Sequence, residues 1–166
     1  MPQPVNYICT KCEFRGSSFS TWGKYSYLIN NEQISINRTI AICYSCQSIV
    51  SVEILPNQER VEKLNSSSDY LQQKFYEEEL QRLEALSQRK SSARCLECGS
   101  HDFEIIPNVE PDKKQRKTGI PIRTGLFHRN CGGRIYADLR APNFFMGDRL
   151  PERFYDVEGI EIENHE

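Results

Sequence analysis

Seven cysteines and one histidine form four pairs, in each of which two residues separate the partners. The pairs are Cys9 with Cys12, Cys43 with Cys46, Cys95 with Cys98, and His128 with Cys131. Two intervening residues let one tight turn direct both side chains at a single ion, and two such turns complete a tetrahedral zinc site. The odd cysteine count argues against a disulfide framework. A chain with this pattern is expected to fold around metal.

The spacing of the four pairs suggests how they combine. Thirty residues separate Cys12 from Cys43, and twenty-nine separate Cys98 from His128. Because the two halves repeat one plan, we expect each half to close its own site, with two Zn2+ per chain. The first site then has four cysteines, and the second has three cysteines and His128. The ligands, in order, are Cys9, Cys12, Cys43, Cys46, Cys95, Cys98, His128 and Cys131.

These residues also allow three alternatives. Thiolate ligands favour zinc, although iron can occupy a four-thiolate site. Redox-active dithiols are less favoured, because one pair would suffice and no strand-to-helix pattern follows the first two pairs. His101 lies three residues after Cys98 and competes with His128 as a ligand, but the two-residue gap before Cys131 favours His128. His165 lies among acidic residues and is interpreted as solvated.

The second half resembles the zinc-ribbon superfamily, whose metal-binding turns are rubredoxin-like knuckles. Residues 95–103 (CLECGSHDF) and 131–135 (CGGRI) look like the two knuckles of such ribbons, with glycine directly after the second ligand. Glycine there permits a left-handed or closely approached backbone. The first half departs from this habit, with Glu13 and Gln47 in those places. The resemblance covers roughly residues 5–55 and 93–140, and it implies a fold and a metal but not one function.

Pattern and composition predict an α+β chain of two small β-rich zinc ribbons joined by a helical linker. We expect a four-cysteine ribbon at 1–56, a linker at 57–92, a ribbon with three cysteines and one histidine at 93–140, and an irregular, acidic, aromatic tail at 141–166. Alternating apolar and polar residues predict strands in both ribbons, and the first ribbon should contain a hairpin. The expected strands are 24–29, 33–37 and 49–55 in the first ribbon, and 102–106, a return through 120–122 and 134–139 in the second.

The linker contains neither proline nor glycine from 58 to 92, which favours helix. Pro56 and Asn57 should begin it, and Asp69 should cap a second helix after a break in the serine run 66–68. An apolar stripe follows Asp69 and either packs on the ribbons or pairs with a second copy. We expect a homodimer, because a helix of about 22 residues spans about 33 Å, more than a ribbon covers. The dimer residues would be Leu71, Phe75, Leu80, Leu83 and Leu86.

The net charge of the whole chain is −2, which excludes a protein that binds nucleic acid by overall positive charge. Basic and acidic residues are nevertheless distributed unevenly along the sequence. Residues 94–140 carry nine basic and six acidic side chains, whereas 141–166 carry two and seven. A basic loop suits phosphate contact, although a solvated loop is the commoner case. The candidate nucleic-acid contacts are Lys113, Lys114, Arg116, Lys117, Arg123 and Arg129.

Catalytic motifs are missing from the sequence, and four-ligand zinc sites leave no open position, so we do not expect an enzyme. The longest apolar runs are too short to span a membrane, and no secretory signal is legible, so we expect a cytoplasmic protein. The acidic balance, the helical stripe and the aromatic tail favour a protein-interaction or adaptor role. DNA or RNA binding through the basic loop is the alternative.

Overall fold

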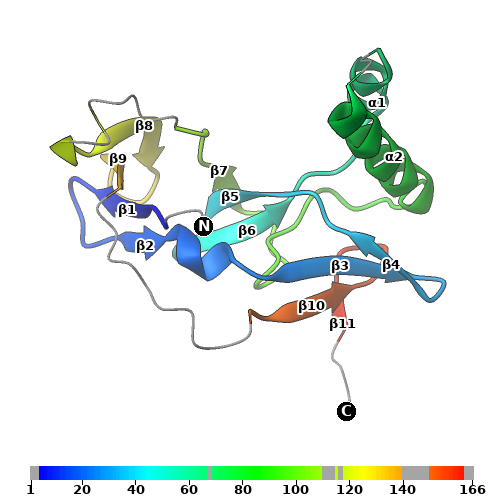
Figure 1. Cartoon of the computed structure of the whole chain (residues 1–166). Coiled ribbons are helices and arrows are strands. Elements are labelled where there is room, and N and C mark those ends of the chain that lie inside the picture. The colour runs from blue at the N-terminus through cyan, green and yellow to red at the C-terminus, as the bar shows by residue number, and fades with distance from the viewer. Residues whose placement is uncertain (1–3, 67–68, 110–114, 116–117, 140–149, 163–166) are drawn as a thin grey trace.

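The computed structural model describes residues 4–66, 69–109, 115, 118–139 and 150–162. These residues form three small sheets and two helices, which confirms the α+β class. Sheet A lies at one end of the molecule, sheet C lies in the middle, and sheet B and the helices lie at the other end (Figure 1).

Sheet A joins the first and the later parts of the chain. Its strand order is β2-β1-β9-β8, and all neighbouring strands are antiparallel. The four strands are β1 (Asn6–Cys9), β2 (Arg15–Ser17), β8 (Ile122–His128) and β9 (Gly133–Asp138). Because β1 pairs with β9, the first knuckle lies beside the last.

Sheet C is the central sheet and has the order β6-β5-β7. Its strands are β5 (Arg38–Cys43), β6 (Ser48–Glu53) and β7 (Phe103–Ile105). The hairpin of β5 and β6 is in register from Arg38 opposite Glu53 to Cys43 opposite Ser48. On its other edge β5 pairs with β7, which brings the second knuckle beside the third.

Sheet B contains the predicted hairpin, preceded by the short 3-10 helix η1 (Ser18–Thr21). Its strands are β3 (Lys24–Ile29), β4 (Glu32–Ser35), β10 (Glu152–Tyr155) and β11 (Glu161–Ile162), in the order β11-β10-β3-β4. Asn30 and Asn31 make the turn with φ of 51° and 65°, a left-handed conformation that asparagine tolerates. The prediction of an irregular tail is wrong for β10 and β11, because β10 pairs with β3 in parallel.

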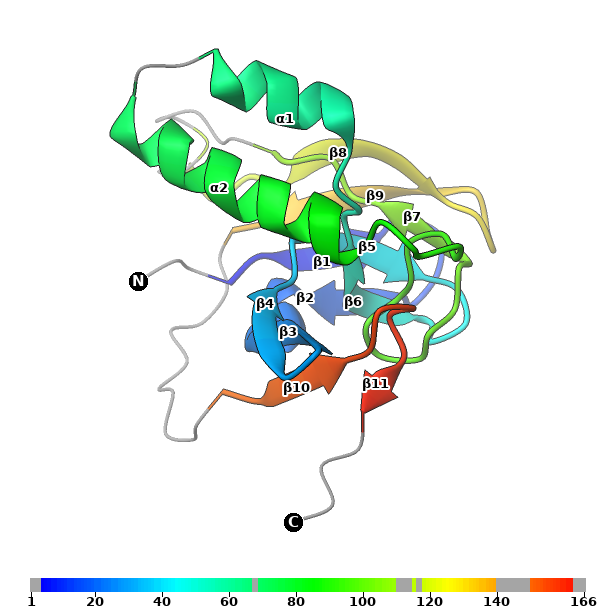
Figure 2. The ribbon, with the colours of Figure 1, turned by 90° about the vertical axis from the view of Figure 1, so that its right-hand side faces the viewer.

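The two linker helices begin where the sequence predicts. Helix α1 (Gln58–Asn65) is capped by Asn57, whose side chain accepts a hydrogen bond from the amide of Arg60 at 2.8 Å. Helix α2 (Tyr70–Ala85) is capped by Asp69. The helices lie side by side above β4 (Figure 2). Arg82 anchors α2 there, because its Nε donates to the carbonyl of Ser35 at 2.7 Å. Among the described residues no helix is long and apolar enough to cross a membrane.

The division into two independent ribbons at 1–56 and 93–140 is wrong. Sheets A and C each take strands from both halves, and the hairpin of β3 and β4 lies in a different sheet from β6. A ribbon of about 50 residues buries little apolar surface by itself. Pairing the halves instead builds a shared cluster between sheets A and C, whose buried members are Tyr7, Ile42, Ile49, Ile106, Ile135 and Ala137.

Candidate metal centres

All eight predicted ligands converge in two groups of four, but they combine differently from the prediction. Within each group the ligand atoms lie within 4.8 Å of one another. We call the first group the outer site: Cys9, Cys12, His128 and Cys131. The second group is the inner site: Cys43, Cys46, Cys95 and Cys98. The first knuckle therefore joins the fourth, and the second joins the third. The expected pairing of neighbouring knuckles is wrong.

The outer site is held by sheet A. Cys9 is the last residue of β1, and its Sγ lies 3.4 Å from that of Cys131 in the turn between β8 and β9. The Nδ1 atom of His128, the last residue of β8, lies 3.2 Å from the Sγ of Cys12 and 3.4 Å from that of Cys131. His128 is almost fully buried, whereas Cys12 is exposed.

The inner site is held at one end of sheet C. The Sγ atoms of Cys43 and Cys98 are 3.7 Å apart, and those of Cys46 and Cys95 are 3.8 Å apart. Cys43 ends β5, and Cys95 lies next to β6 through an isolated bridge to Val52. Cys43 and Cys95 are buried, and Cys98 is exposed.

These distances fit a tetrahedral zinc ion. Zinc–sulfur bonds of about 2.3 Å place two sulfur ligands about 3.8 Å apart, and a zinc–nitrogen bond of about 2.0 Å places nitrogen and sulfur about 3.5 Å apart. The inner distances of 3.7 and 3.8 Å match, and the outer ones are a few tenths of an ångström shorter. Soft thiolate and imidazole donors also suit zinc. The two groups indicate a zinc-binding protein with two Zn2+ per chain, in which each ion would take four protein ligands.

The turns carry the features of metal-binding knuckles. Backbone amides point at ligand sulfurs: Lys11 N to Cys9, and Glu97 N to Cys95, each at 3.4 Å. Gly99 and Gly132 have φ of 72° and 68°, which agrees with the glycine predicted after the second ligand. In the second knuckle Gln47 takes this place and adopts φ of 53° without being glycine. The first half therefore makes a similar turn with a bulkier residue.

The thiols differ in acidity because their surroundings differ. Burial raises the pKa of Cys46 above its ordinary value and that of Cys95 to about 12. Burial acts in the same direction on Cys9 and Cys98, but backbone amides outweigh it and lower their pKa. Two of the four inner thiols, those of Cys46 and Cys95, therefore lose their protons less readily than a free cysteine. A divalent ion would supply the charge that lets them ionise.

Two aromatic rings pack against His128. The ring of Phe14 lies 4.6 Å from that of His128, and the ring of Tyr44 stacks on it at 5.9 Å and 17°. His101, the alternative ligand, lies outside both groups. Its exposed Nδ1 is 3.0 Å from Ser92 Oγ and 2.9 Å from the carbonyl of Ala93.

Tyr44 connects the two sites. It lies between two inner ligands in sequence, and its ring stacks on the outer ligand His128. Its hydroxyl donates to Glu104 at 3.1 Å and accepts from the amide of Arg129 at 3.2 Å. Burial raises the pKa of Tyr44, so this hydroxyl stays protonated and able to donate. The guanidinium of Arg129 lies 3.8 Å above the same ring and pairs with Asp102 at 2.7 Å.

No family model matches the chain, and no curated protein or solved structure matches it significantly. The class of protein therefore rests on the two ligand groups themselves, and the zinc-ribbon resemblance stays at the level of the individual knuckles.

The predicted nucleic-acid contacts fall into three groups. Lys113, Lys114, Arg116 and Lys117 lie outside the described residues. Arg123 is exposed on β8, where its Nε donates to the hydroxyl of Tyr136 at 3.0 Å. Arg129 is committed to Asp102 and Tyr44, as described above.

The residues predicted to form the dimer differ in how far they are exposed. Leu86 is buried in the chain's own core, packed with Tyr25, Tyr27 and other residues of one cluster, so it does not belong to an open surface. Leu80 and Leu83 are partly buried. Leu71 and Phe75 remain 60% and 55% exposed.

Sequence reasoning missed one surface. The face of sheet A that turns away from the core carries Arg15, Ile8, Tyr136, Arg123, Arg134 and Phe127, which we call the open face. Its residues come from two pairs of neighbouring strands, β1 with β2 and β8 with β9, and the two pairs are more than a hundred residues apart in the sequence. The sequence had indicated Arg123 as a phosphate contact, and Arg134 and Tyr136 alternate with buried residues along one strand, but neither signal shows that β8 and β9 lie beside β1 and β2.

Proposed function

We propose that the protein is a non-catalytic zinc protein that binds nucleic acid through the open face. Two observations support the non-catalytic part. Each group supplies four protein ligands, which is typical of structural zinc sites. The knuckles also join strands that are distant in sequence, so the metals would serve to hold the fold together. Thiolate ligands persist in a reducing compartment, and we propose a cytoplasmic location.

The observation that carries the nucleic-acid proposal is a row of cationic and aromatic side chains across sheet A. In register, Arg123 lies opposite Tyr136, Tyr136 opposite Ile8, and Ile8 opposite Arg15. Arg134 lies two residues from Tyr136 on the same strand and is opposite Phe127. Arginines interleaved with aromatic rings match the needs of nucleic acid, which presents phosphates and base faces together.

Local charge supports the same proposal. Residues 4–22 and 118–139, which include all of sheet A, carry five basic and two acidic side chains, a net charge of +3 in a chain of net charge −2. The basic residues are Lys11, Arg15, Arg123, Arg129 and Arg134. A positive lobe on an otherwise acidic protein directs a polyanion to one end of the molecule.

The test is binding of labelled mixed-sequence DNA and RNA, single-stranded and duplex, over a salt series. We expect affinity to fall as salt rises, because bound phosphates release counterions. Replacing Arg15, Arg123 and Arg134 together by alanine should weaken binding strongly. The matched control replaces three exposed lysines outside sheet A, Lys24, Lys63 and Lys74, with the same change in net charge. Equal losses from both triple variants, or no binding at low salt, would overturn the proposal.

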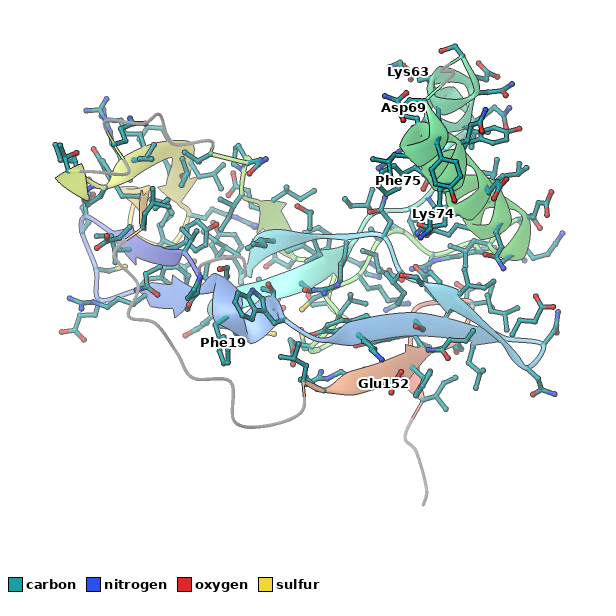
Figure 3. The ribbon with its side chains drawn as sticks, in the orientation of Figure 1. Phe19, Lys63, Asp69, Lys74, Phe75 and Glu152 are labelled. Atoms are coloured by element: carbon teal, nitrogen blue, oxygen red, sulfur yellow. The ribbon has the colours of Figure 1, made fainter. Side chains whose placement is uncertain are left out.

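A second proposal, interaction with protein, has a specific observation in its favour. Tyr70, Leu71 and Phe75 are 77%, 60% and 55% exposed on the first half of α2. Figure 3 shows Phe75 and Lys74 on this helix, at the opposite end of the molecule from sheet A. We propose a second copy of this chain as the partner. The remaining features that favoured an adaptor are partly taken up by the fold itself, since Tyr155 is buried and its hydroxyl donates to the carbonyl of Leu96.

A further inference from the structure

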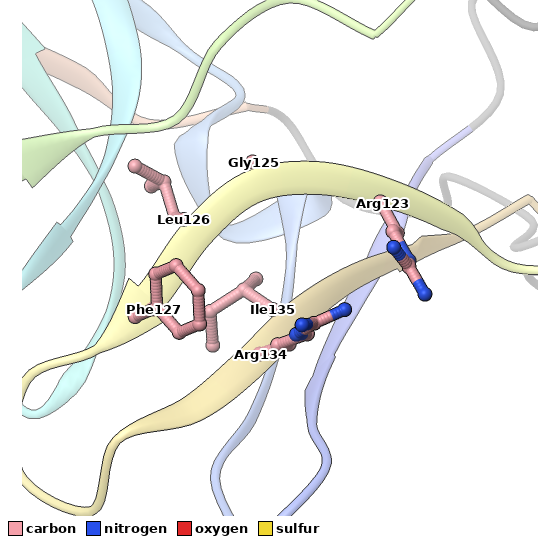
Figure 4. Close-up of a pocket in the computed structure, with 6 residues that line it drawn as sticks. All are labelled: Arg123, Gly125, Leu126, Phe127, Arg134 and Ile135. Atoms are coloured by element: carbon pink, nitrogen blue, oxygen red, sulfur yellow. The ribbon is translucent and has the colours of Figure 1, made fainter.

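Phe127 is an unusual residue to leave in water. Phe127 lies on β8 and is 57% exposed, whereas the next residue, His128, is buried. Its ring borders a depression of about 230 Å3 lined by Arg123, Gly125, Leu126, Phe127, Arg134 and Ile135. Figure 4 shows Arg123 and Arg134 lying near each other at this depression, with Phe127 further along the hairpin of β8 and β9. An exposed ring beside two guanidinium groups points to a ligand that is both flat and anionic.

A bulge in β8 keeps the depression open. The register between β8 and β9 shifts between Arg123 and Phe127, and Gly125 adopts φ of 88° within this segment. A Cβ at Gly125 would meet no atom within 4 Å, so the space above it is free. Bulges redirect side chains and are common next to binding sites. Here the bulge lies between Arg123 and Phe127, and Gly125 within it adds no side chain to the depression.

The two arginines of the hairpin are each placed beside a ring. The guanidinium carbon of Arg134 lies 5.8 Å from the centre of the Phe127 ring, and Arg123 donates to the hydroxyl of Tyr136. Tyr136 and Arg134 are two positions apart on β9, which places them about 6.8 Å apart along one face. The open face thus places a ring next to a cation along β9 and across the hairpin of β8 and β9.

We propose that the open face binds single-stranded nucleic acid, with bases stacked on Phe127 and Tyr136 and phosphates at Arg123 and Arg134. This inference rests on the proposed nucleic-acid function. An unpaired base offers its whole flat face to an exposed ring, whereas the bases of a duplex are already stacked on one another. A sheet face is also flat, and the described part of sheet A presents no helix that would enter a groove. Stacking is tolerant of sequence, so the preference is for strandedness and not for a motif.

The experiment compares single-stranded oligonucleotides with a hairpin duplex of the same sequence, using the zinc-loaded full chain. Single strands should bind at least tenfold more tightly than the duplex. Phe127→Ala should weaken single-strand binding about tenfold or more and leave the salt dependence unchanged, because a ring contributes no counterion release. Arg134→Ala should weaken binding and reduce the slope of log K against log salt by about 0.7, as expected for one lost phosphate contact.

Ile160→Ala is the matched control, since this apolar side chain is 54% exposed and directly precedes β11 in sheet B, at the other end of the molecule. It should leave affinity unchanged. Equal affinity for duplex and single strand, or a Phe127→Ala variant that binds as the parent does, would overturn the inference while leaving the proposed function intact. Absence of all nucleic-acid binding would overturn both. Binding of polyglutamate with the affinity seen for oligonucleotides would assign the open face to acidic proteins instead.

Discussion

At the scale of the residue, the outer site depends on a close approach that only glycine permits. A Cβ at Gly133 would collide with the Sγ of Cys9 and come within 2.9 Å of the backbone nitrogen of Lys11. Neither neighbour can yield, because one is a metal ligand and the other is backbone. Gly133 is therefore required for the metal site as well as for the turn.

We expect Gly133→Ala to lose the outer zinc and keep the inner one, which elemental analysis of the purified protein measures as a fall from two zinc ions per chain to one. Gly132→Ala is the control. Its φ of 68° costs alanine about 1 kcal/mol, but the nearest atom to a Cβ there is the flexible end of Lys11 at 4.0 Å. It should keep both ions. Two ions in Gly133→Ala would show that the turn can open without losing the site.

A second residue-scale feature is a buried ion pair next to the third knuckle. Glu53 on β6 receives two hydrogen bonds from the guanidinium of Arg89, at 2.7 and 2.8 Å, and both side chains are at most 2% exposed. The Tyr27 hydroxyl and the Arg94 amide donate to the same carboxylate at 2.6 and 2.8 Å. Although burial lowers the pKa of Arg89, its contacts with Glu53 outweigh this and raise it. The carboxylate therefore joins sheet C, sheet B and the segment after α2.

Removing this carboxylate should be costly, because Arg89 would remain as a buried charge without a partner. Glu53→Ala is expected to lower the free energy of unfolding by about 3–5 kcal/mol, measured by urea denaturation of the zinc-loaded protein. Glu59→Ala provides the contrast, since its pair with Lys63 is about three quarters exposed on both sides. That change should stay within about 0.5 kcal/mol. Similar losses for the two variants would contradict the role of Glu53.

At the scale of the element, local signals were sufficient to predict helices and hairpin. The caps at Asn57 and Asp69 lie where their side chains can accept backbone hydrogen bonds, and the turn at Asn30 and Asn31 follows from the tolerance of asparagine for positive φ. The strands of the tail were not predictable in this way. Strand β10 is specified by its neighbour β3, more than a hundred residues away, and not by its own pattern.

The open half of α2 leads to the prediction on oligomeric state. Three exposed side chains of about 150–250 Å2 each, at the exposures found, offer roughly 300–400 Å2 per copy. Stable interfaces bury about 800 Å2 per partner. We therefore expect a homodimer that dissociates on dilution, with light scattering giving about twice 19.3 kDa at high concentration and the monomer mass at low concentration.

Charged side chains in the patch should abolish this pairing. Leu71→Glu with Phe75→Glu is expected to give a monomer at every concentration, because burying four carboxylates per dimer is unfavourable. Gln73→Glu with Gln81→Glu adds the same charge at exposed positions of the same helix and should leave the dimer unchanged. If the parent protein is a monomer throughout, the second copy is excluded as the partner of α2.

At the scale of the whole molecule, the ligands were predictable and their combination was not. A two-residue gap is a local property, so each knuckle can be identified from the sequence alone. Four knuckles combine into two sites in three ways, and the nearly equal spacings favoured joining neighbours. The combination agrees instead with long-range packing, because Tyr7 and Ile135 of sheet A are buried against Ile42 and Ile49 of sheet C.

The resulting arrangement is nested, with the inner site closed inside the loop of the outer one. Cys46 and Cys95 are 49 positions apart, whereas Cys12 and His128 are 116 positions apart. Closing the longer loop alone costs about 0.8 kcal/mol more entropy. Packing adds to this asymmetry. The hairpin of β5 and β6, whose turn lies at the inner site, packs against the apolar face of sheet A. Leu96 of the third knuckle packs into the apolar cluster that contains Tyr25 and Tyr27 of sheet B.

We therefore expect the inner site to form without the outer one, but not the reverse. Cys12→Ser and Cys98→Ser are matched changes, because both thiols are exposed and both are the second cysteine of their knuckle. Cys12→Ser should retain one zinc ion per chain and the NMR dispersion of sheets B and C. Cys98→Ser should lose both ions, since sheet A then has no ordered sheet C to pack against. Native mass spectrometry counts the ions in each variant. One ion retained by Cys98→Ser, bound at the outer site, would mean that the two centres fold independently.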